Sequence, residues 1–340
     1  MISNNLKISL QTTKGFTDIN DLIPGDKLLE YKTNNLLIVE NIKMSLNPYK
    51  LFKISLTDGR EIILIDRSFV NLNGNLIQLS DILNTKEFPL LTQHQIDYSE
   101  LGIQKYLFPD PYITGALLVN ADFDDYFINL PLDRNKAIDL LFNKYHIEYE
   151  SITKNNKVYF KKINENHMIS WGEFFKGERI FPVTKNFNDP IIPNQFIFGS
   201  INDRWQFVRG AFDVGYDSKM FPDNIALANK SEDRLKIFQK ILWSLGILSK
   251  ITYDPHIPNN KGRKYRLDIL NSYEEYPGLF YNLENIRYIL NSDNLLKHHD
   301  YFELKIKSIE YIGDSNIMYI ETNKHLASAI TSNYLPYVLI

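Results

Sequence analysis

The sequence runs twice through the same succession of elements. Each copy starts with two helices, expected at Pro111–Val119 and Leu132–Tyr145 in the first copy and at Asp203–Val214 and Ser231–Leu245 in the second. A basic two-stranded ribbon then follows, with strands expected at Ile147–Thr153 and Val158–Ile163, and at Ile247–Tyr253 and Lys264–Leu270. Counted from Gly115 to Gly210, the spacing is 95 residues. This repeat predicts two α+β units of one architecture. Asp203 and Ser231 are the expected caps of the second pair of helices.

Short β-prone runs flank the repeated part on both sides. Before it lie Lys7–Leu10, Lys27–Tyr31, Leu36–Ile42, Leu51–Leu56, Glu61–Ile65 and Phe69–Leu72; after it lie Phe302–Tyr311, Ile317–Glu321 and Tyr334–Ile340. Turn signals such as Asp58-Gly59 separate the runs. Strands at this spacing predict a small all-β domain. The sequence thus predicts one β domain that is split along the chain, with the duplicated α+β unit inserted into it.

Composition and charge exclude several classes of protein and of functional site. The chain is 44% hydrophobic and 23% charged, and no apolar run approaches the about 18 residues of a membrane helix. The start MISNNLKISL lacks the pattern of a secretory signal, so a cytoplasmic protein without membrane contact is expected. The absence of cysteine excludes thiolate zinc sites and cysteine nucleophiles. Residues 151–266 carry a net charge of +8 and residues 51–150 a net −7, so the middle of the chain would tolerate a polyanion. An ordinary solvated face is the alternative.

Several motifs resemble those of a known family. Leu22-Ile23-Pro24-Gly25-Asp26 and Leu56-Thr57-Asp58-Gly59-Arg60 are similar to segments of the Hint domain, the fold of inteins. Asp110-Pro111-Tyr112-Ile113-Thr114-Gly115 and Val208-Arg209-Gly210-Ala211-Phe212-Asp213 resemble the two signature helices of LAGLIDADG homing endonucleases. The resemblance implies a mixed fold: an all-β Hint domain at 1–94 plus 302–340, and an inserted pseudo-twofold α+β endonuclease domain at 95–301. The repeats are expected at about 108–190 and 191–301.

The resemblance also implies where splicing residues should lie. An intein needs a nucleophile at its first position, a Thr-x-x-His pair and a terminal His-Asn. The corresponding positions here are Met1, the pair Leu64 and Arg67, and the final residues Leu339 and Ile340. None of these side chains supplies the required chemistry, so splicing is expected to be lost. Deliberate removal of these groups would leave the same pattern.

The endonuclease resemblance likewise implies a metal site. Each signature helix should end in a carboxylate that holds a divalent metal such as Mg²⁺ between the scissile phosphates. Aligning Gly115 with Gly210 places these positions at Asn120 and Gly215, neither of which is charged. Asp122 and Asp217 lie two residues further on and are the possible substitutes; solvated turn residues are the alternative for both. Asp213 is expected to be a buried or capping carboxylate.

The resemblance finally implies contacts to duplex DNA from the two ribbons. Strand alternation puts Lys157, Tyr159 and Lys161 on one face of the first ribbon. In the second ribbon it groups Lys261, Arg263 and Tyr265, with Lys264 and Arg266 on the reverse. Solubilising charges on exposed hairpins are the alternative.

The sequence therefore predicts an intein-derived, homing-endonuclease-like protein that binds double-stranded DNA as a monomer. Splicing and DNA cleavage are expected to be lost, so no Mg²⁺ is needed unless cleavage persists. Two alternatives remain open: an active endonuclease with displaced carboxylates, and a structural or interaction protein that retains only the fold.

Overall fold

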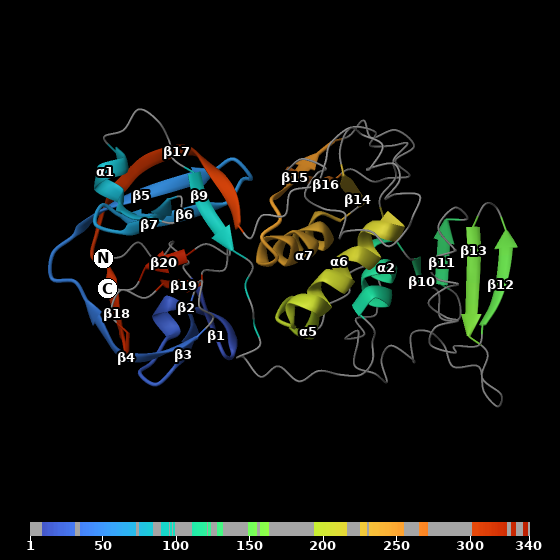
Figure 1. Ribbon diagram of the computed structural model, residues 1–340, viewed down its shortest axis with the longest axis horizontal. Coiled ribbons are helices and arrows are strands. Elements are labelled where there is room, and N and C mark those ends of the chain that lie inside the picture. Colours follow the sequence, from blue (N-terminus) through green and yellow to red (C-terminus); the bar gives the residue numbers. More distant parts are fainter. Residues whose placement is uncertain are drawn as a thin grey trace. The chain divides into compact units, whose positions relative to one another are not determined.

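The structure is a computed structural model of the 340-residue chain. It describes residues 9–30, 35–72, 75–83, 90–94, 96, 98, 111–120, 122–123, 128–131, 149–154, 157–162, 194–215, 225–229, 231–254, 265–270, 301–324, 328–330 and 336–338. The chain divides into two compact units (Figure 1). Unit 1 comprises Met1–Gly102, Trp243–Leu248 and His299–Ile340, and unit 2 comprises Ile103–Leu242 and Ser249–His298. Both ends of the chain therefore belong to unit 1.

Unit 1 contains a five-stranded sheet in the order β18-β4-β3-β1-β2. Its strands are β1 (Ser9–Thr12), β2 (Gly15–Asp18), β3 (Lys27–Leu29), β4 (Leu36–Met44) and β18 (Met318–Thr322), with a 3₁₀ turn η1 at Ile19–Asp21. Alternation along β4 buries Leu37 and Val39, which are each 1% exposed, while Ile38 is 41% exposed. The antiparallel pairing of β18 with β4 sets Met318 opposite Met44. Buried Ile320 thereby joins the core cluster of Leu37 and Val39.

A second sheet of unit 1 has the order β6-β5-β17-β9-β7-β8. Its strands are β5 (Tyr49–Leu56), β6 (Glu61–Ile65), β7 (Phe69–Leu72), β8 (Asn75–Gln78), β9 (Leu90–His94) and β17 (Tyr301–Ser315), and a short helix α1 covers Leu79–Leu83. The 15-residue strand β17 pairs with β5 along one part and with β9 along another, with register shifts at Ile306/Ser308 and Tyr311/Gly313. Such bulges bend a strand, which lets β17 join strands from distant parts of the sequence. A small ribbon of β19 (Ser328–Ile330) and β20 (Pro336–Val338) completes the unit.

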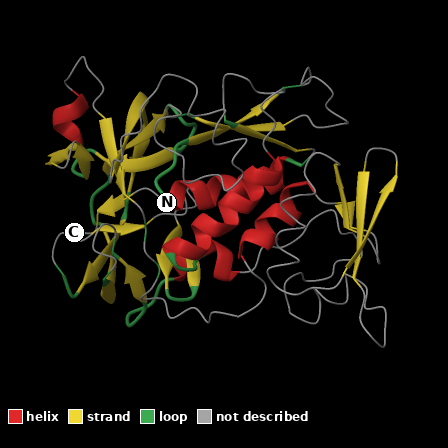
Figure 2. Ribbon diagram, turned by 45° about the vertical axis from the view of Figure 1, so that its right-hand side comes forward, coloured by secondary structure: helices red, strands yellow, loops and turns green. Residues whose placement is uncertain are grey.

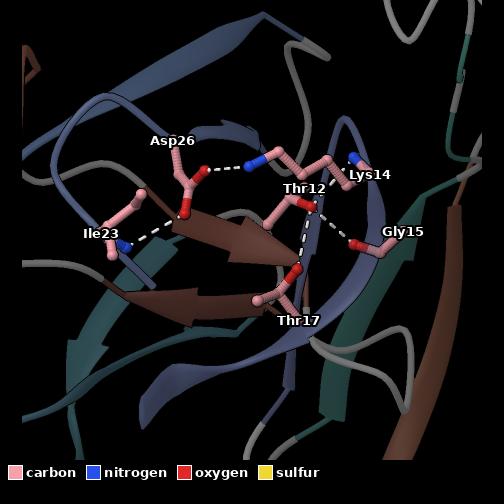
Figure 3. Close-up of polar contacts among 6 residues, drawn as sticks. All are labelled: Thr12, Lys14, Gly15, Thr17, Ile23 and Asp26. Carbon is pink, nitrogen blue, oxygen red and sulfur yellow. Dashed lines mark hydrogen bonds and ion pairs between the residues drawn. The ribbon is translucent and has the colours of Figure 1, made fainter. Parts of the chain in front are cut away.

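A polar network fixes the turn before β3 (Figure 3). The Asp26 carboxylate accepts hydrogen bonds from Lys14 Nζ at 2.8 Å and from the Ile23 backbone N–H at 3.0 Å. The bond from Lys14, followed by that from Ile23, holds the pKa of Asp26 below its ordinary value. Gly25 adopts a φ of 95°, a left-handed conformation that favours glycine. The Gly-Asp pair of the sequence motif therefore has a structural role in this turn.

The described helices of unit 2 lie together (Figure 2). They are α2 (Pro111–Asn120), α5 (Asn194–Ile197), α6 (Ile201–Gly215) and α7 (Glu232–Ser244). Helix α7 belongs to this unit up to Leu242. Ser231 caps α7, because its hydroxyl accepts a hydrogen bond from the Arg234 N–H at 3.3 Å. The expectation that Asp203 caps α6 is wrong. Ser200 accepts the Asp203 N–H at 3.2 Å, and the helix starts two residues before Asp203.

Each half of unit 2 contributes one sheet. The first has the order β10-β11-β13-β12, with β10 (Asp122–Phe123), β11 (Ile128–Pro131), β12 (Tyr149–Lys154) and β13 (Lys157–Lys162). The second has the order β14-β16-β15, with β14 (Ala226–Asn229), β15 (Ser249–Tyr253) and β16 (Tyr265–Ile269). The order β11-β13-β12 thus recurs as β14-β16-β15. Both predicted ribbons are present, within two residues of the expected bounds.

Among the described residues, strands are numerous and helices few. The elements that were not predicted are strands β2, β8, β9, β10, β11, β14 and β19, the short helices α1 and α5 and the 3₁₀ turn η1. The expected helix Leu132–Tyr145 lies outside the described residues. No described helix combines the length and apolar character needed to cross a bilayer.

Candidate functional site

The two long-separated helices α2 and α6 pack directly against each other. The two backbones are close at Gly115, where an added Cβ atom would lie 1.8 Å from the carbonyl oxygen of Phe207 and 3.2 Å from the Ala211 nitrogen. Only a residue without a side chain allows two helix backbones to come this close. Gly115 and Gly210, the pair that marks the sequence repeat, are both buried in this unit.

A partly buried hydrogen bond links the same two helices. The hydroxyl of Tyr112 donates to Asp213 Oδ2 at 2.6 Å, and Asp213 is 4% exposed. Asp213 is therefore a buried structural carboxylate, as the sequence analysis expected. A further hydrogen bond joins α2 to strand β14: the side-chain amide of Asn229 donates to the Val119 carbonyl at 2.8 Å. This bond satisfies a carbonyl in the last turn of α2, which has no partner within the helix.

The helix ends meet at Gly215, the last residue of α6. An added Cβ would lie 2.6 Å from Leu227 Cδ2 and 2.8 Å from Val119 Cγ2. Contacts this short require neighbouring atoms to move. The space that a carboxylate at this position would need is thus occupied by the apolar side chains of Val119 from α2 and Leu227 from β14.

The residues present at this point do not fit a divalent metal. Gly215 has no side-chain donor, and Mg²⁺ requires oxygen ligands. Within the described ranges, no group of three or more His, Asp or Glu side chains could hold a metal ion. Asn120 is the last residue of α2 and Asp122 the first residue of β10. Asp217 lies outside the described residues.

In the first ribbon, the strand register shows which of the expected DNA-contact positions lie on the same face of the sheet. Lys157, Tyr159 and Lys161 are alternate residues of β13, so their positions share one face. Tyr159 pairs with Asn129 of β11, which in turn pairs with Asp122. Position 122 therefore shares this face with the three candidate contact positions.

Both faces of the second ribbon carry buried side chains: Leu267 and Ile269 on one face, and Ala226, Ala228 and Asp268 on the other. Tyr265 shares its face with Leu267, which is fully buried and pairs with Leu227, the residue that packs against Gly215. Tyr265 also makes an edge-to-face contact with the exposed ring of Tyr253, at 5.4 Å between centroids. Arg266 lies on the opposite face and keeps 28% of its side chain exposed. Lys261, Arg263 and Lys264 lie outside the described residues.

Sequence reasoning missed the polar groups around Arg266. Arg266 Nε lies 2.7 Å from Asp268 Oδ1, and Asp254 Oδ2 lies 3.8 Å from its Nη1. The other oxygen of Asp268 accepts a hydrogen bond from the Thr252 hydroxyl at 3.1 Å. Alternation along β15 and β16 puts 252, 266 and 268 on one face, a signal that was present in the sequence.

The intein resemblance implies an acid–base pair at residues 64 and 67. Residue 64 has no acid–base group. Leu64 is a 4% exposed strand residue opposite Phe52. Arg67 is exposed, and its guanidinium lies 5.5 Å from the ring centroid of Tyr49. Tyr319 donates a very short hydrogen bond to the Tyr49 hydroxyl, and burial together with this bond raises the pKa of Tyr319 to about 12. Met1, Leu339 and Ile340 lie outside the described residues.

No protein-family model and no curated protein matches the chain. Among solved structures, the gp41-1 intein is similar at 28% identity and a TM-score of 0.22, over 25% of this chain and 63% of the intein chain. This chain thus spans less than two thirds of that intein. The homing endonuclease I-DmoI, in complex with DNA and Ca, is similar at 11% identity and a TM-score of 0.35, over 54% of this chain and 100% of the endonuclease. An I-DmoI complex with its target DNA and Mg has a TM-score of 0.33 at 12% identity, over 54% and 93%. Both kinds of protein that the sequence resembles therefore occur among the structures similar to this chain.

Proposed function

We propose that this chain is an intein-derived relative of the LAGLIDADG homing endonucleases that binds double-stranded DNA and has lost splicing and DNA cleavage. The observation that carries the proposal is the packing of α2 on α6 at Gly115, where the two helix backbones leave no space for a Cβ atom. The signature motifs of the sequence fall on these two helices. In this proposal unit 1 is the split Hint domain, and unit 2 is the pseudo-twofold endonuclease domain.

DNA binding is assigned to the two ribbons of unit 2. Recurrence of the strand order β11-β13-β12 as β14-β16-β15 supports two equivalent binding elements within one chain. A pseudo-symmetric duplex site then needs only a monomer. Lys157 and Lys161 share a strand face, and cations at such positions neutralise phosphates and release counterions.

Loss of cleavage is assigned to the helix ends. Two carboxylates would be needed to hold Mg²⁺ against the scissile phosphates. Gly215 supplies none, and Val119 and Leu227 fill the space beside it. Loss of splicing rests on Leu64, whose buried alkyl side chain cannot move a proton.

One observation favours a second candidate, an active endonuclease with displaced carboxylates. Asp122 begins β10, two residues after α2 ends, and its register places it on the face of the Lys157–Lys161 positions. With Asp217 it would have to provide the metal ligands. Robust double-strand cutting that Asp122→Ala or Asp217→Ala abolishes would establish this candidate and overturn the loss of cleavage.

A salt titration of duplex binding tests the main proposal. The full chain should shift a random duplex in a mobility assay, and the affinity should fall by orders of magnitude between low and physiological salt. Lys157→Ala and Lys161→Ala should each reduce the slope of log affinity against log salt by about one. Lys236→Ala is the matched control, because this exposed lysine of α7 is already paired with Glu232 and Asp233. Absence of a shift at every salt concentration would instead indicate an interaction protein.

A further inference from the structure

The end of helix α7 and the residues after it belong to unit 1. The segment Trp243–Leu248 lies between two parts of unit 2 in the sequence, but it is part of the compact unit that contains the strands of unit 1. Gly246 follows the helix end with a left-handed φ of 78°, and its N–H donates to the Trp243 carbonyl at 3.0 Å. Leu245 and Ile247 are fully buried. Unit 1 therefore includes a short apolar segment that its other two stretches of sequence do not supply.

A buried ion pair occupies the turn between β5 and β6 of the same unit. The side chains of Asp58 and Arg60 are both 0% exposed, and Arg60 Nε donates to Asp58 Oδ2 at 2.7 Å. The Arg60 backbone N–H donates to the other carboxylate oxygen at 3.1 Å. Burial of two charges carries a desolvation cost, which is offset only when the geometry is good and further contacts satisfy both groups. The guanidinium therefore depends on what covers it.

Trp243 covers this guanidinium. The Arg60 Cζ atom lies 4.8 Å from the centroid of the Trp243 ring, which is within the range of a cation–π contact. Such a contact is stronger when it is desolvated than at an exposed site. One residue further on, the Ser244 carbonyl accepts a hydrogen bond from the Ile96 N–H at 2.9 Å. Carbonyls in the last turn of a helix lack a partner within the helix, and Ile96 supplies one here. Two adjacent residues of α7 thus hold two separate parts of unit 1.

We propose that the β5–β6 turn of unit 1 stays closed only while the end of α7 is helical, so that α7 links the stability of this turn to that of unit 2. Unwinding of the last helical turn would release the contacts of Trp243 and Ser244 and would uncover the buried ion pair. Helix α7 begins at Glu232 within unit 2, so a ligand that stabilises the helix there would also stabilise the turn. The inference goes beyond the proposed DNA binding and does not depend on it.

Hydrogen exchange of the full chain, followed by mass spectrometry of the peptide that spans the turn, tests the proposal without any DNA. The Leu56 N–H donates to the Arg60 carbonyl at 2.9 Å, and the Gly59 N–H donates to the Leu56 carbonyl at 3.0 Å. Both amides should exchange when the turn opens. Trp243→Ala should raise their exchange rate by about 10-fold or more, because it removes a buried cation–π contact.

Two further comparisons serve as controls. Trp205→Ala is matched to Trp243→Ala, because the Trp205 ring lies 5.7 Å from the Arg209 guanidinium within α6; it should leave the turn unchanged. Lys240 is exposed on α7, so Lys240→Gly weakens the helix without removing a buried contact. This variant should raise the exchange rates of α7 and of the turn together, by about 5-fold. Lys240→Ala retains the helix propensity and should raise neither rate.

Each outcome supports or overturns the inference. An unaltered exchange rate at the turn in Trp243→Ala would show that Trp243 does not hold the turn closed and would overturn it. Faster exchange of α7 in Lys240→Gly with an unaltered turn would overturn it as well, as would equal acceleration of the turn by Trp205→Ala. If Trp243→Ala does not fold, Lys240→Gly provides the test at an exposed position. None of these results bears on duplex binding, so the proposed function is tested separately.

Discussion

Tyr112 and Asp213 join α2 to α6 through a hydrogen bond of 2.6 Å, although 101 residues separate them in the sequence. We expect Tyr112→Phe to lower the free energy of unfolding by about 1–2 kcal/mol, because a buried acceptor loses its donor. Urea unfolding measures this change. Asn202→Ala, at an exposed position of α6, is the control and should change stability little. An unaltered unfolding curve for Tyr112→Phe would show that the bond contributes nothing.

Gly115 sets the distance between the same two helices. Gly115→Ala should lower the free energy of unfolding by about 3 kcal/mol or more, because the new methyl group would overlap the Phe207 carbonyl oxygen. In an ordinary helix interior the same change stabilises by roughly 0.5–1 kcal/mol. Thermal or urea unfolding therefore tests the close packing at Gly115 by whether Gly115→Ala lowers or raises the free energy of unfolding. Stabilisation would contradict the observed packing.

Gly215→Asp should not increase DNA cleavage in the presence of Mg²⁺ or Mn²⁺. The added side chain collides with Val119 and Leu227, so the variant should instead be less stable by about 1–3 kcal/mol. Leu227→Ala opens space, and the double variant should lose less stability than the two single losses added together. A plasmid-nicking assay and urea unfolding measure the two effects. Cutting by Gly215→Asp at undiminished stability would refute the inferred packing role.

The lowered pKa of Asp26 predicts a dependence of stability on acid. The Lys14 and Ile23 bonds favour the carboxylate, so its folded pKa lies below the ordinary 3.8. The resulting stabilisation is present above about pH 3.8 and is lost as the pH falls through the folded pKa. Asp26→Asn should therefore be less stable than the unaltered protein at neutral pH, and the difference should shrink in acid. Lys14→Met should show a smaller acid dependence; a difference that is constant with pH would contradict the assignment.

The raised pKa of Tyr319 predicts the opposite dependence in alkali. The folded state favours the neutral phenol, so its stabilisation is present below pH 10.0 and is lost as the pH rises to about 12. The stability advantage of the unaltered protein over Tyr319→Phe should decline across this interval. Parallel urea unfolding curves of both proteins between these pH values test it. An advantage that grows with pH would contradict the buried pairing with Tyr49.

Local patterns in the sequence predicted many elements of the fold. Strands Glu61–Ile65 and Phe69–Leu72 have the expected bounds, and Ser231 caps α7 as foreseen. The short strand Gly15–Asp18 was missed, because Gly15 and Asp18 at its two ends are residues typical of turns. Asp203 was misassigned as a cap since Ser200, three residues earlier, offers the same chemistry.

Some features of the candidate site could likewise be predicted from the sequence, and others depend on the tertiary structure. Residue type and strand period are local properties, so the sequence alone predicts that residues 120 and 215 carry no carboxylate and that basic side chains alternate along two ribbons. The packing of the elements, in contrast, placed Leu227 and Val119 beside Gly215 and set Leu267 opposite Leu227 on the neighbouring strand. It also brought Asp268 and Thr252 to Arg266. These contacts join residues from separate strands and helices, and their geometry depends on how those elements pack.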